Sequence, residues 1–227
     1  MTFAHGSRSK LTPRDAGRFP TESLFDRVAR AVCRAECLPR KELFESWEVA
    51  RRVRRRMRGG RVLDLACGHG LTAQLMLLLD DSSPCAIAID TRLPASANHL
   101  HDELVRTWPR LAGRTFFEER SLAEVTVRAT DVVLSVHACG ALTDRVLELS
   151  VGARARLAVL PCCQSLSESA GVELSGWLDP ALAVDVSRVA FLQSRGYDVH
   201  TQTLPIAITP KNRLLIGMAH EQATRDA

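Results

Sequence analysis

A glycine turn that directly follows a buried strand is the feature that most restricts how this chain can fold. Residues 62–66 are apolar apart from Asp64, and residues 67–70 read Cys-Gly-His-Gly before a helical pattern begins. Glycine permits a sharp turn and lets a ligand approach the backbone closely. This order of strand, glycine turn and helix predicts the first unit of an α/β fold, with a ligand bound at the turn.

Short apolar runs alternate with helical patterns after this turn. We expect helices at residues 71–79, 95–108, 141–149 and 182–194, and strands at residues 61–66, 85–90, 114–119, 131–136, 157–160, 197–204 and 214–219. Such alternation predicts a mainly parallel sheet with helices on both faces. Because no helix separates the last two strands, we expect them to form an antiparallel hairpin at one edge. The predicted fold class is α/β, a Rossmann-like, seven-stranded sheet whose first five strands have the order 3-2-1-4-5.

The amino-terminal part differs from the rest of the chain in its composition and periodicity. Residues 1–20 mix glycine, proline and charge without periodicity, which predicts a loose tail. Residues 21–60 carry two helical patterns, the second of which runs from Lys41 to Met57. We therefore expect a flexible tail at 1–20, a helical extension at 21–60 and the ligand-binding domain at 61–220.

Composition indicates a globular protein in a reducing compartment. Of the 227 residues, 46% are hydrophobic and 25% are charged, which is ordinary for a globular chain. No apolar run approaches the ~18 residues that a membrane-spanning helix needs, and the first residues lack the apolar segment of a secretion signal. The cysteines number seven, an odd count, which argues against a disulfide framework. We expect a cytoplasmic protein with free thiols and no membrane contact.

The glycine turn by itself is compatible with two nucleotide cofactors. Gly68, Gly70 and Ala73 satisfy the dinucleotide pattern G-x-G-x-x-G/A, which is weak evidence alone. Asp64 favours S-adenosylmethionine, because a carboxylate here faces the cationic methionine end of that cofactor or orders the loop. NAD, in contrast, needs a free helix N-terminus for its pyrophosphate. The helical sequence before the first strand favours S-adenosylmethionine too. Asp90, which ends the second strand, is expected to accept hydrogen bonds from the ribose hydroxyls of either cofactor. An NAD enzyme and a ligand-free relic of the fold are the alternatives.

Four segments resemble those of a known family. Residues 62–70, Val-Leu-Asp-Leu-Ala-Cys-Gly-His-Gly, look like motif I of class I methyltransferases, and Ala-Ile-Ala-Ile-Asp at 86–90 looks like their motif II. Ser-Val-His-Ala-Cys-Gly-Ala-Leu-Thr-Asp at 135–144 and Val-Leu-Pro-Cys-Cys at 159–163 narrow the likeness. They resemble the family that includes the glutathione S-transferase C-terminal-domain-containing protein and its methyltransferase-like relatives.

The resemblance covers roughly residues 40–220, since residues 210–217 are similar to the family's closing strand. It implies an S-adenosylmethionine-dependent methyltransferase. The chain departs from the pattern at Gln164, where relatives often have histidine, so the acceptor of those relatives is not carried over. The residues expected to bind the cofactor are Asp64, Ala66, Cys67, Gly68, His69, Gly70, Asp90, Thr91, Ser121, Leu122 and His137.

Cysteine and histidine side chains follow three strands that the expected order makes neighbours. They are Cys67, His137, Cys139, Cys162 and Cys163, and ligands bind at this edge of an open parallel sheet. Plain packing of small side chains around a cofactor is the first interpretation. Catalysis, with His137 as a base or Cys139 as a thiolate, is the second, and a metal site is the third. Because the chain has no C-x-x-C spacing we predict no metal, and the catalytic residue stays open.

Two further groups of residues bear on the methyl acceptor. The substrate candidates are Phe44, Trp47, Cys162, Cys163, Lys211 and Asn212. Arg51, Arg54, Arg55 and Arg58 share a face of the expected second helix, and such a field is typical of RNA binding. The alternative is a solvated face that Glu42, Glu45 and Glu48 partly neutralise.

The sequence therefore leaves three functions open beyond cofactor binding. The chain is an RNA methyltransferase, a methyltransferase for a small molecule or protein, or a non-catalytic module that binds S-adenosylmethionine. Its oligomeric state is left open as well.

Overall fold

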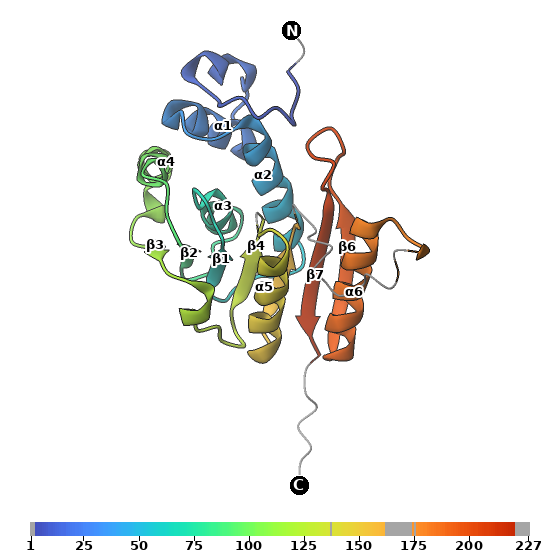
Figure 1. Ribbon diagram of the computed structural model, residues 1–227. Coiled ribbons are helices and arrows are strands. Elements are labelled where there is room, and N and C mark those ends of the chain that lie inside the picture. Colours follow the sequence, from blue (N-terminus) through green and yellow to red (C-terminus); the bar gives the residue numbers. More distant parts are fainter. Residues whose placement is uncertain (1–2, 137, 162–173, 175, 221–227) are drawn as a thin grey trace.

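The computed structural model describes residues 3–136, 138–161, 174 and 176–220 (Figure 1). Its strands are β1 (Val62–Leu65), β2 (Ala86–Asp90), β3 (Thr115–Glu119), β4 (Val132–Ser135), β5 (Arg156–Val159), β6 (Tyr197–Thr203) and β7 (Arg213–Ala219). Its α-helices are α1 (Leu24–Ala35), α2 (Arg40–Arg54), α3 (Leu71–Leu79), α4 (Ser96–Thr107), α5 (Ala141–Gly152) and α6 (Pro180–Ser194). Short 3-10 helices lie at Pro13–Arg18 (η1), Pro109–Leu111 (η2) and Leu122–Glu124 (η3).

One sheet holds all seven strands, in the order β3-β2-β1-β4-β5-β7-β6. β1 to β5 pair in parallel, and β7 runs antiparallel between β5 and β6. The predicted α/β fold, strand order and edge hairpin are therefore confirmed. β1 lies at the centre of the parallel part, so the glycine turn after it is flanked by the ends of β2 and β4.

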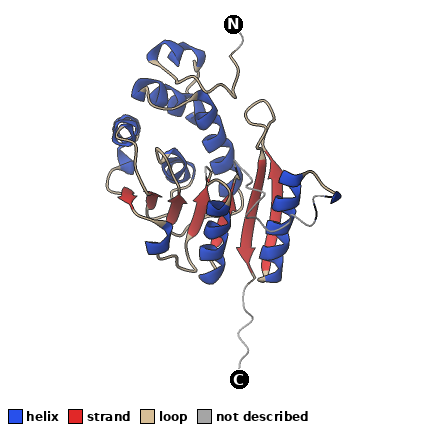
Figure 2. Ribbon diagram, in the orientation of Figure 1, coloured by secondary structure: helices blue, strands red, loops and turns tan. Residues whose placement is uncertain are grey.

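Helices lie on both sides of the sheet (Figure 2), and alternate residues of its central strand pack in two different clusters. Val62 packs in a cluster with Val53 of α2 and Leu75 of α3. Its neighbour Leu63 packs in a second cluster with Leu192 of α6. A strand that is buried on both faces has a continuous run of apolar residues, which is why the strand at 62–66 could be predicted from the sequence.

The amino-terminal segment differs from the loose tail that the sequence predicts. Leu11 is fully buried and Phe19 is 3% exposed. The Leu11 amide donates to the Leu38 carbonyl at 2.9 Å, and the Arg40 guanidinium lies 3.7 Å from the centre of the Phe3 ring. Isolated apolar side chains anchor an irregular segment here, and such anchors leave no periodicity to detect.

Some helix boundaries also differ from expectation, and α5 ends at Gly152 rather than at 149. α2 ends at Arg54 rather than at Met57, because the last turn tightens: the Val53 carbonyl accepts from the Arg56 amide, only three residues on, at 2.9 Å as well as from the Met57 amide at 2.8 Å. α6 begins at Pro180, where the Asp179 carboxylate accepts from the Leu182 amide at 3.1 Å. None of the helices in the described ranges is long and apolar enough to cross a membrane.

Candidate functional site

The turn between β1 and α3 is left-handed at three positions, namely Ala66 (φ 55°), Gly68 (φ 54°) and Gly70 (φ 66°). A Cβ at Gly70 would lie 2.7 Å from Phe117 Cε1 and 2.9 Å from Ala88 Cβ, so glycine is required there by space as well as by φ. At Gly68 a Cβ would meet nothing within 4 Å. The turn is therefore tight on its sheet side and open at Gly68.

Asp64 lies beneath this turn and is 1% exposed. Its Oδ2 accepts from the Ala73 amide in the first turn of α3 at 3.1 Å. Burial, opposed by the hydrogen bond from the Ala73 amide and assisted by the nearby Asp90 charge, raises the pKa of Asp64 to about 8. Of the two roles expected from the sequence, the geometry supports the second, in which Asp64 orders the loop.

Replacing Asp64 with asparagine should flatten part of the pH dependence of stability. The pKa of Asp64 in the folded state is raised above its value in the unfolded state. The stabilisation that comes from protonated Asp64 is therefore fully present below about pH 4 and is lost as pH rises through about 8. Wild-type Tm should therefore fall relative to Asp64→Asn by roughly 5–10 °C from pH 5 to 8. Thermal melts across that range check this, with exposed Asp102→Asn as control. Parallel Tm curves for wild type and Asp64→Asn would contradict it.

Asp90, at the end of β2, reaches across to the turn. Its Oδ2 accepts from the Gly68 amide at 2.9 Å, and its Oδ1 accepts from the Thr91 amide at 2.8 Å. The structure therefore brings Gly68, Asp90 and Thr91 together. Their role in cofactor binding stays a prediction.

His69 joins the turn to two helices, through contacts that sequence reasoning missed. Its Nε2 lies 3.0 Å from Ser96 Oγ of α4, and its Nδ1 lies 3.9 Å from Glu42 Oε2 of α2. Burial and the neighbouring Glu45 raise the pKa of Glu42. No sequence pattern marks these partners, because they come from elements far apart in the chain.

Ser121 and Leu122 lie beside the end of β2, where the Arg120 amide donates to the Asp90 carbonyl at 2.8 Å. The Ser121 amide donates to Glu124 Oε2 at 3.0 Å in a capping box. The expected helix-cap role of Ser121 is thus present, next to the predicted cofactor site.

Only part of the cysteine and histidine group can be placed. Cys67 is buried, and burial raises the pKa of its thiol far above the ordinary range, so it is no thiolate nucleophile. Cys139 is exposed. His137, Cys162 and Cys163 lie outside the described residues. Within the described part of the chain, no cluster of histidine, cysteine and acidic side chains could hold a metal ion.

The aromatic substrate candidates lie in packing contacts. The Phe44 ring stacks on His5 with centroids 4.2 Å apart, and Trp47 lies 5.1 Å from Phe25. These contacts fasten the amino-terminal segment and α1 to α2.

The polar substrate candidates lie in the loop between β6 and β7. The Asn212 side-chain amide donates to the Leu204 carbonyl at 2.8 Å, and the Lys211 backbone amide donates to Thr209 Oγ1 at 3.3 Å. Asn212 thus closes the loop.

Comparison with known proteins decides the family. A family model described as a methyltransferase domain matches residues 42–169. The chain belongs to this methyltransferase family. The family and the fold confirm the predicted methyltransferase domain. The search of curated proteins found no match.

Solved structures share the fold of this methyltransferase. An O-methyltransferase family protein from Burkholderia thailandensis is 19% identical, with TM-score 0.54 over 92% of this chain and 64% of that one. Mitomycin 7-O-methyltransferase is 16% identical, with TM-score 0.52 over 92% and 64%. Magnesium protoporphyrin IX methyltransferase from Synechocystis PCC 6803, solved with bound SAH, is 14% identical, with TM-score 0.53 over 89% and 97%. This chain spans less than two thirds of the first of these structures.

The arginine run of the methyltransferase is not the free basic face that the sequence suggested. Arg54 is 4% exposed and donates to the Met76 carbonyl at 2.9 Å and to Ser83 Oγ at 2.8 Å. Arg51 pairs with Glu48 at 3.0 Å, whereas Arg55 and Arg58 are exposed. The predicted face therefore loses Arg54 to the interior and is partly neutralised.

The arginine run also lies at the opposite edge of the sheet from the glycine turn. Arg156 opens β5 and donates to the carbonyls of Arg58, Gly59 and Thr130, which precede β1 and β4. The end of α2 is thus held at the amino ends of these strands. Gly68 and Asp90 lie at the opposite, carboxyl ends.

Proposed function

We propose that this methyltransferase transfers the methyl group of S-adenosylmethionine to a small-molecule acceptor. The observation that carries the proposal is the Asp90 carboxylate held on the Gly68 amide, beside open space at Gly68. The opposite position of the arginine run argues against RNA as the acceptor.

The residues present fit the cofactor. Gly68 leaves room for a ligand against the backbone, and Asp90 offers carboxylate oxygens at the edge of that room to ribose hydroxyls. Asp64 holds the start of α3, so the turn is ordered before the ligand arrives. We extend this role to Ala66, Cys67, His69, Gly70 and Thr91 of the two loops, and to Ser121 and Leu122 beside Asp90. The bound SAH of the Synechocystis enzyme, which shares this fold, supports the choice of cofactor.

Methyl transfer here depends chiefly on position. When bound, the cofactor supplies an electrophilic methyl carbon that bonds to the acceptor heteroatom as its bond to sulfur breaks, with SAH and a proton as by-products. The chain must align the acceptor and exclude water, and such positioning supplies most of the acceleration. Cys139 is the first described polar side chain after β4, and we keep it and His137 as catalytic candidates.

Incubation with methyl-labelled cofactor and fractionated cell extract tests the acceptor class. We expect label in the small-molecule fraction, and we expect Arg55→Ala and Arg58→Ala to retain activity within about twofold, because exposed charges remote from the site contribute little. Label in RNA that these variants abolish, with steep salt dependence, would establish RNA instead. Tight SAH binding without transfer to any fraction would indicate a non-catalytic module.

Two finer assignments also belong to this proposal. Segments 135–144 and 159–163 support kinship with the glutathione S-transferase C-terminal-domain-containing protein and its relatives. The free thiols of Cys33, Cys37, Cys67 and Cys85 support a reducing, cytoplasmic location.

A further inference from the structure

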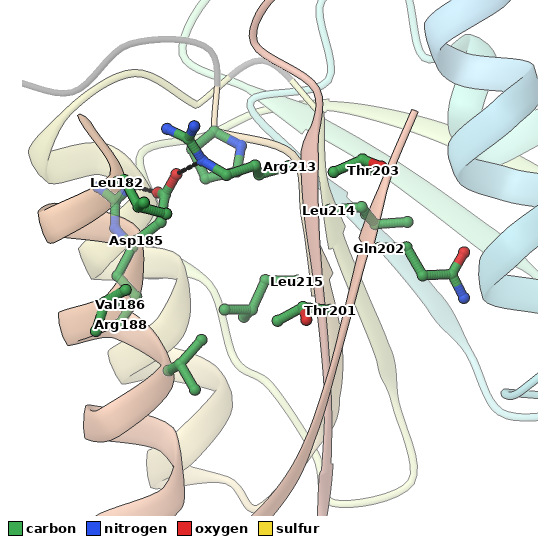
Figure 3. A pocket seen from close by; sticks show the side chains of 12 residues that line it. Leu182, Asp185, Val186, Arg188, Thr201, Gln202, Thr203, Arg213, Leu214 and Leu215 are labelled. Atoms are coloured by element: carbon green, nitrogen blue, oxygen red, sulfur yellow. Dashed lines mark hydrogen bonds and ion pairs between the residues drawn. The ribbon is translucent and has the colours of Figure 1, made fainter. Parts of the chain in front are cut away.

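A cleft of about 500 Å³ separates the first half of α6 from the edge strands β6 and β7 (Figure 3). Leu182, Val186 and Val189 line it from the helix, and Leu215 and Thr201 line it from the sheet. A volume of this size suits a small organic molecule, and an apolar lining with few polar groups is typical of ligand pockets. Val186 is 39% exposed although it is a large apolar side chain of the helix.

Charged side chains gather at one end of the cleft. Asp185 accepts from Arg188 Nη1 at 3.1 Å and from Arg213 Nε at 2.6 Å, as Figure 3 shows for the latter pair. Arg188 Nε donates to Asp144 Oδ1 at 2.7 Å. Arg188 is 4% exposed and uses all three nitrogens, whereas within the described chain Arg213 bonds only through Nε.

The hydrogen-bonding groups that remain unused at this end of the cleft are therefore a fork of N–H donors on Arg213. The Arg213 side chain is 35% exposed, and its two terminal nitrogens remain for a ligand. A guanidinium fork binds an anionic oxygen pair more strongly than a neutral group. An anion is the complementary ligand, because both carboxylates already accept from arginine.

The same end of the cleft touches the loop after β4. Arg188 Nη2 donates to the Gly140 carbonyl at 3.2 Å, and Thr143 Oγ1 donates to the Ala138 carbonyl at 2.9 Å. These two bonds hold the loop on either side of Cys139. Pro161, which lines the cleft, follows β5 at the same carboxyl edge as the cofactor turn.

We infer that this cleft binds the methyl acceptor, and that the acceptor is a small apolar molecule with one anionic group held by Arg213. The inference rests on the proposed function, since it names the acceptor site of that reaction. Arg188 is a positioning residue, because it acts through the loop after β4.

Two fluorescent probes and four variants test the inference. Anilinonaphthalene sulfonate combines an aromatic body with an anion, and phenylnaphthylamine is similar without the charge. Val186→Trp fills the cleft from an exposed helix position, and Arg213→Gln removes the fork while it retains a donor for Asp185. Arg145→Gln, at an exposed ion pair with Glu148, and Phe116→Trp, at the exposed face of β3, are the matched controls.

We expect Val186→Trp to weaken both probes about tenfold or more, and Arg213→Gln to weaken only the anionic probe by a similar factor. Both variants should lose labelled methyl transfer to the small-molecule fraction. The same fraction should displace the anionic probe from the wild-type protein. SAH binding measured by calorimetry should stay within about twofold in all four variants, and the controls should behave as wild type.

The possible failures are distinguishable. Unchanged probe binding and methyl transfer in Val186→Trp and Arg213→Gln, with SAH binding intact, would overturn the acceptor site. Equal loss of both probes in Arg213→Gln would overturn the anionic class. Absence of SAH binding to wild type would instead defeat the proposed function, and label confined to RNA or protein would defeat the small-molecule acceptor and this site with it.

Discussion

Replacing Asp90 with alanine is expected to weaken SAH binding roughly 10- to 100-fold. The carboxylate accepts from the Gly68 amide at 2.9 Å, and in the proposed cofactor site it also accepts from the ribose. Alanine removes both acceptors and leaves the Gly68 amide without its partner at the mouth of the site. Isothermal calorimetry with SAH gives the dissociation constant directly.

Asp90→Asn is the matched variant for this prediction. Its amide oxygen still accepts one hydrogen bond, so its loss of affinity should be clearly smaller than that of Asp90→Ala. Both proteins should melt within a few degrees of wild type, because Asp90 is only partly buried. SAH affinity unchanged in Asp90→Ala would exclude this carboxylate from the cofactor site.

Replacing Gly70 with alanine is expected to lower Tm by about 5–15 °C, because left-handed strain and a steric clash add together. The added methyl group would lie 2.7 Å from the Phe117 ring and 2.9 Å from Ala88. Ala88 cannot retreat easily, since it is fully buried in β2. Thermal melting followed by circular dichroism measures the effect.

Gly68→Ala separates the effect of left-handed backbone strain on Tm from the effect of the steric clash. Its φ of 54° is as left-handed as that of Gly70, but nothing lies within 4 Å of the added methyl group, so Tm should fall by only about 2–6 °C. Its SAH affinity should nevertheless fall, because the open space at Gly68 is where we place the cofactor. Equal melting temperatures for the two variants would show that the contact with Phe117 does not restrict the turn. Undiminished SAH binding to Gly68→Ala would remove the cofactor from this position.

The fold could be predicted because its signals are local. Buried parallel strands read as continuous apolar runs, and the glycine turn after residues 62–66 requires a left-handed backbone that few other residues adopt. The edge hairpin follows from the absence of a helix between 197–204 and 214–219. These features depend on neighbouring residues, so the sequence contains the information.

The partners of charged side chains could not be predicted in the same way. Helical spacing places Arg54 on the same face as Arg51, but it cannot show that Met76 and Ser83 receive Arg54 in the interior. The pairing of His69 with Ser96 likewise joins positions whose proximity depends on how α4 packs. Periodicity reports which face of a helix is polar, and it does not report what packs against that face.

The glycine turn, Asp64 and Asp90 were visible in the sequence by itself, because strand and turn chemistry require those residue types at that spacing. Only the tertiary structure decided that Asp64 holds α3, that the arginine run lies at the opposite edge from the cofactor turn, and that Arg213 faces a cleft beside α6. These three results depend on contacts between elements distant in the chain. Such contacts are set by how the layers pack, and no short stretch of sequence records them.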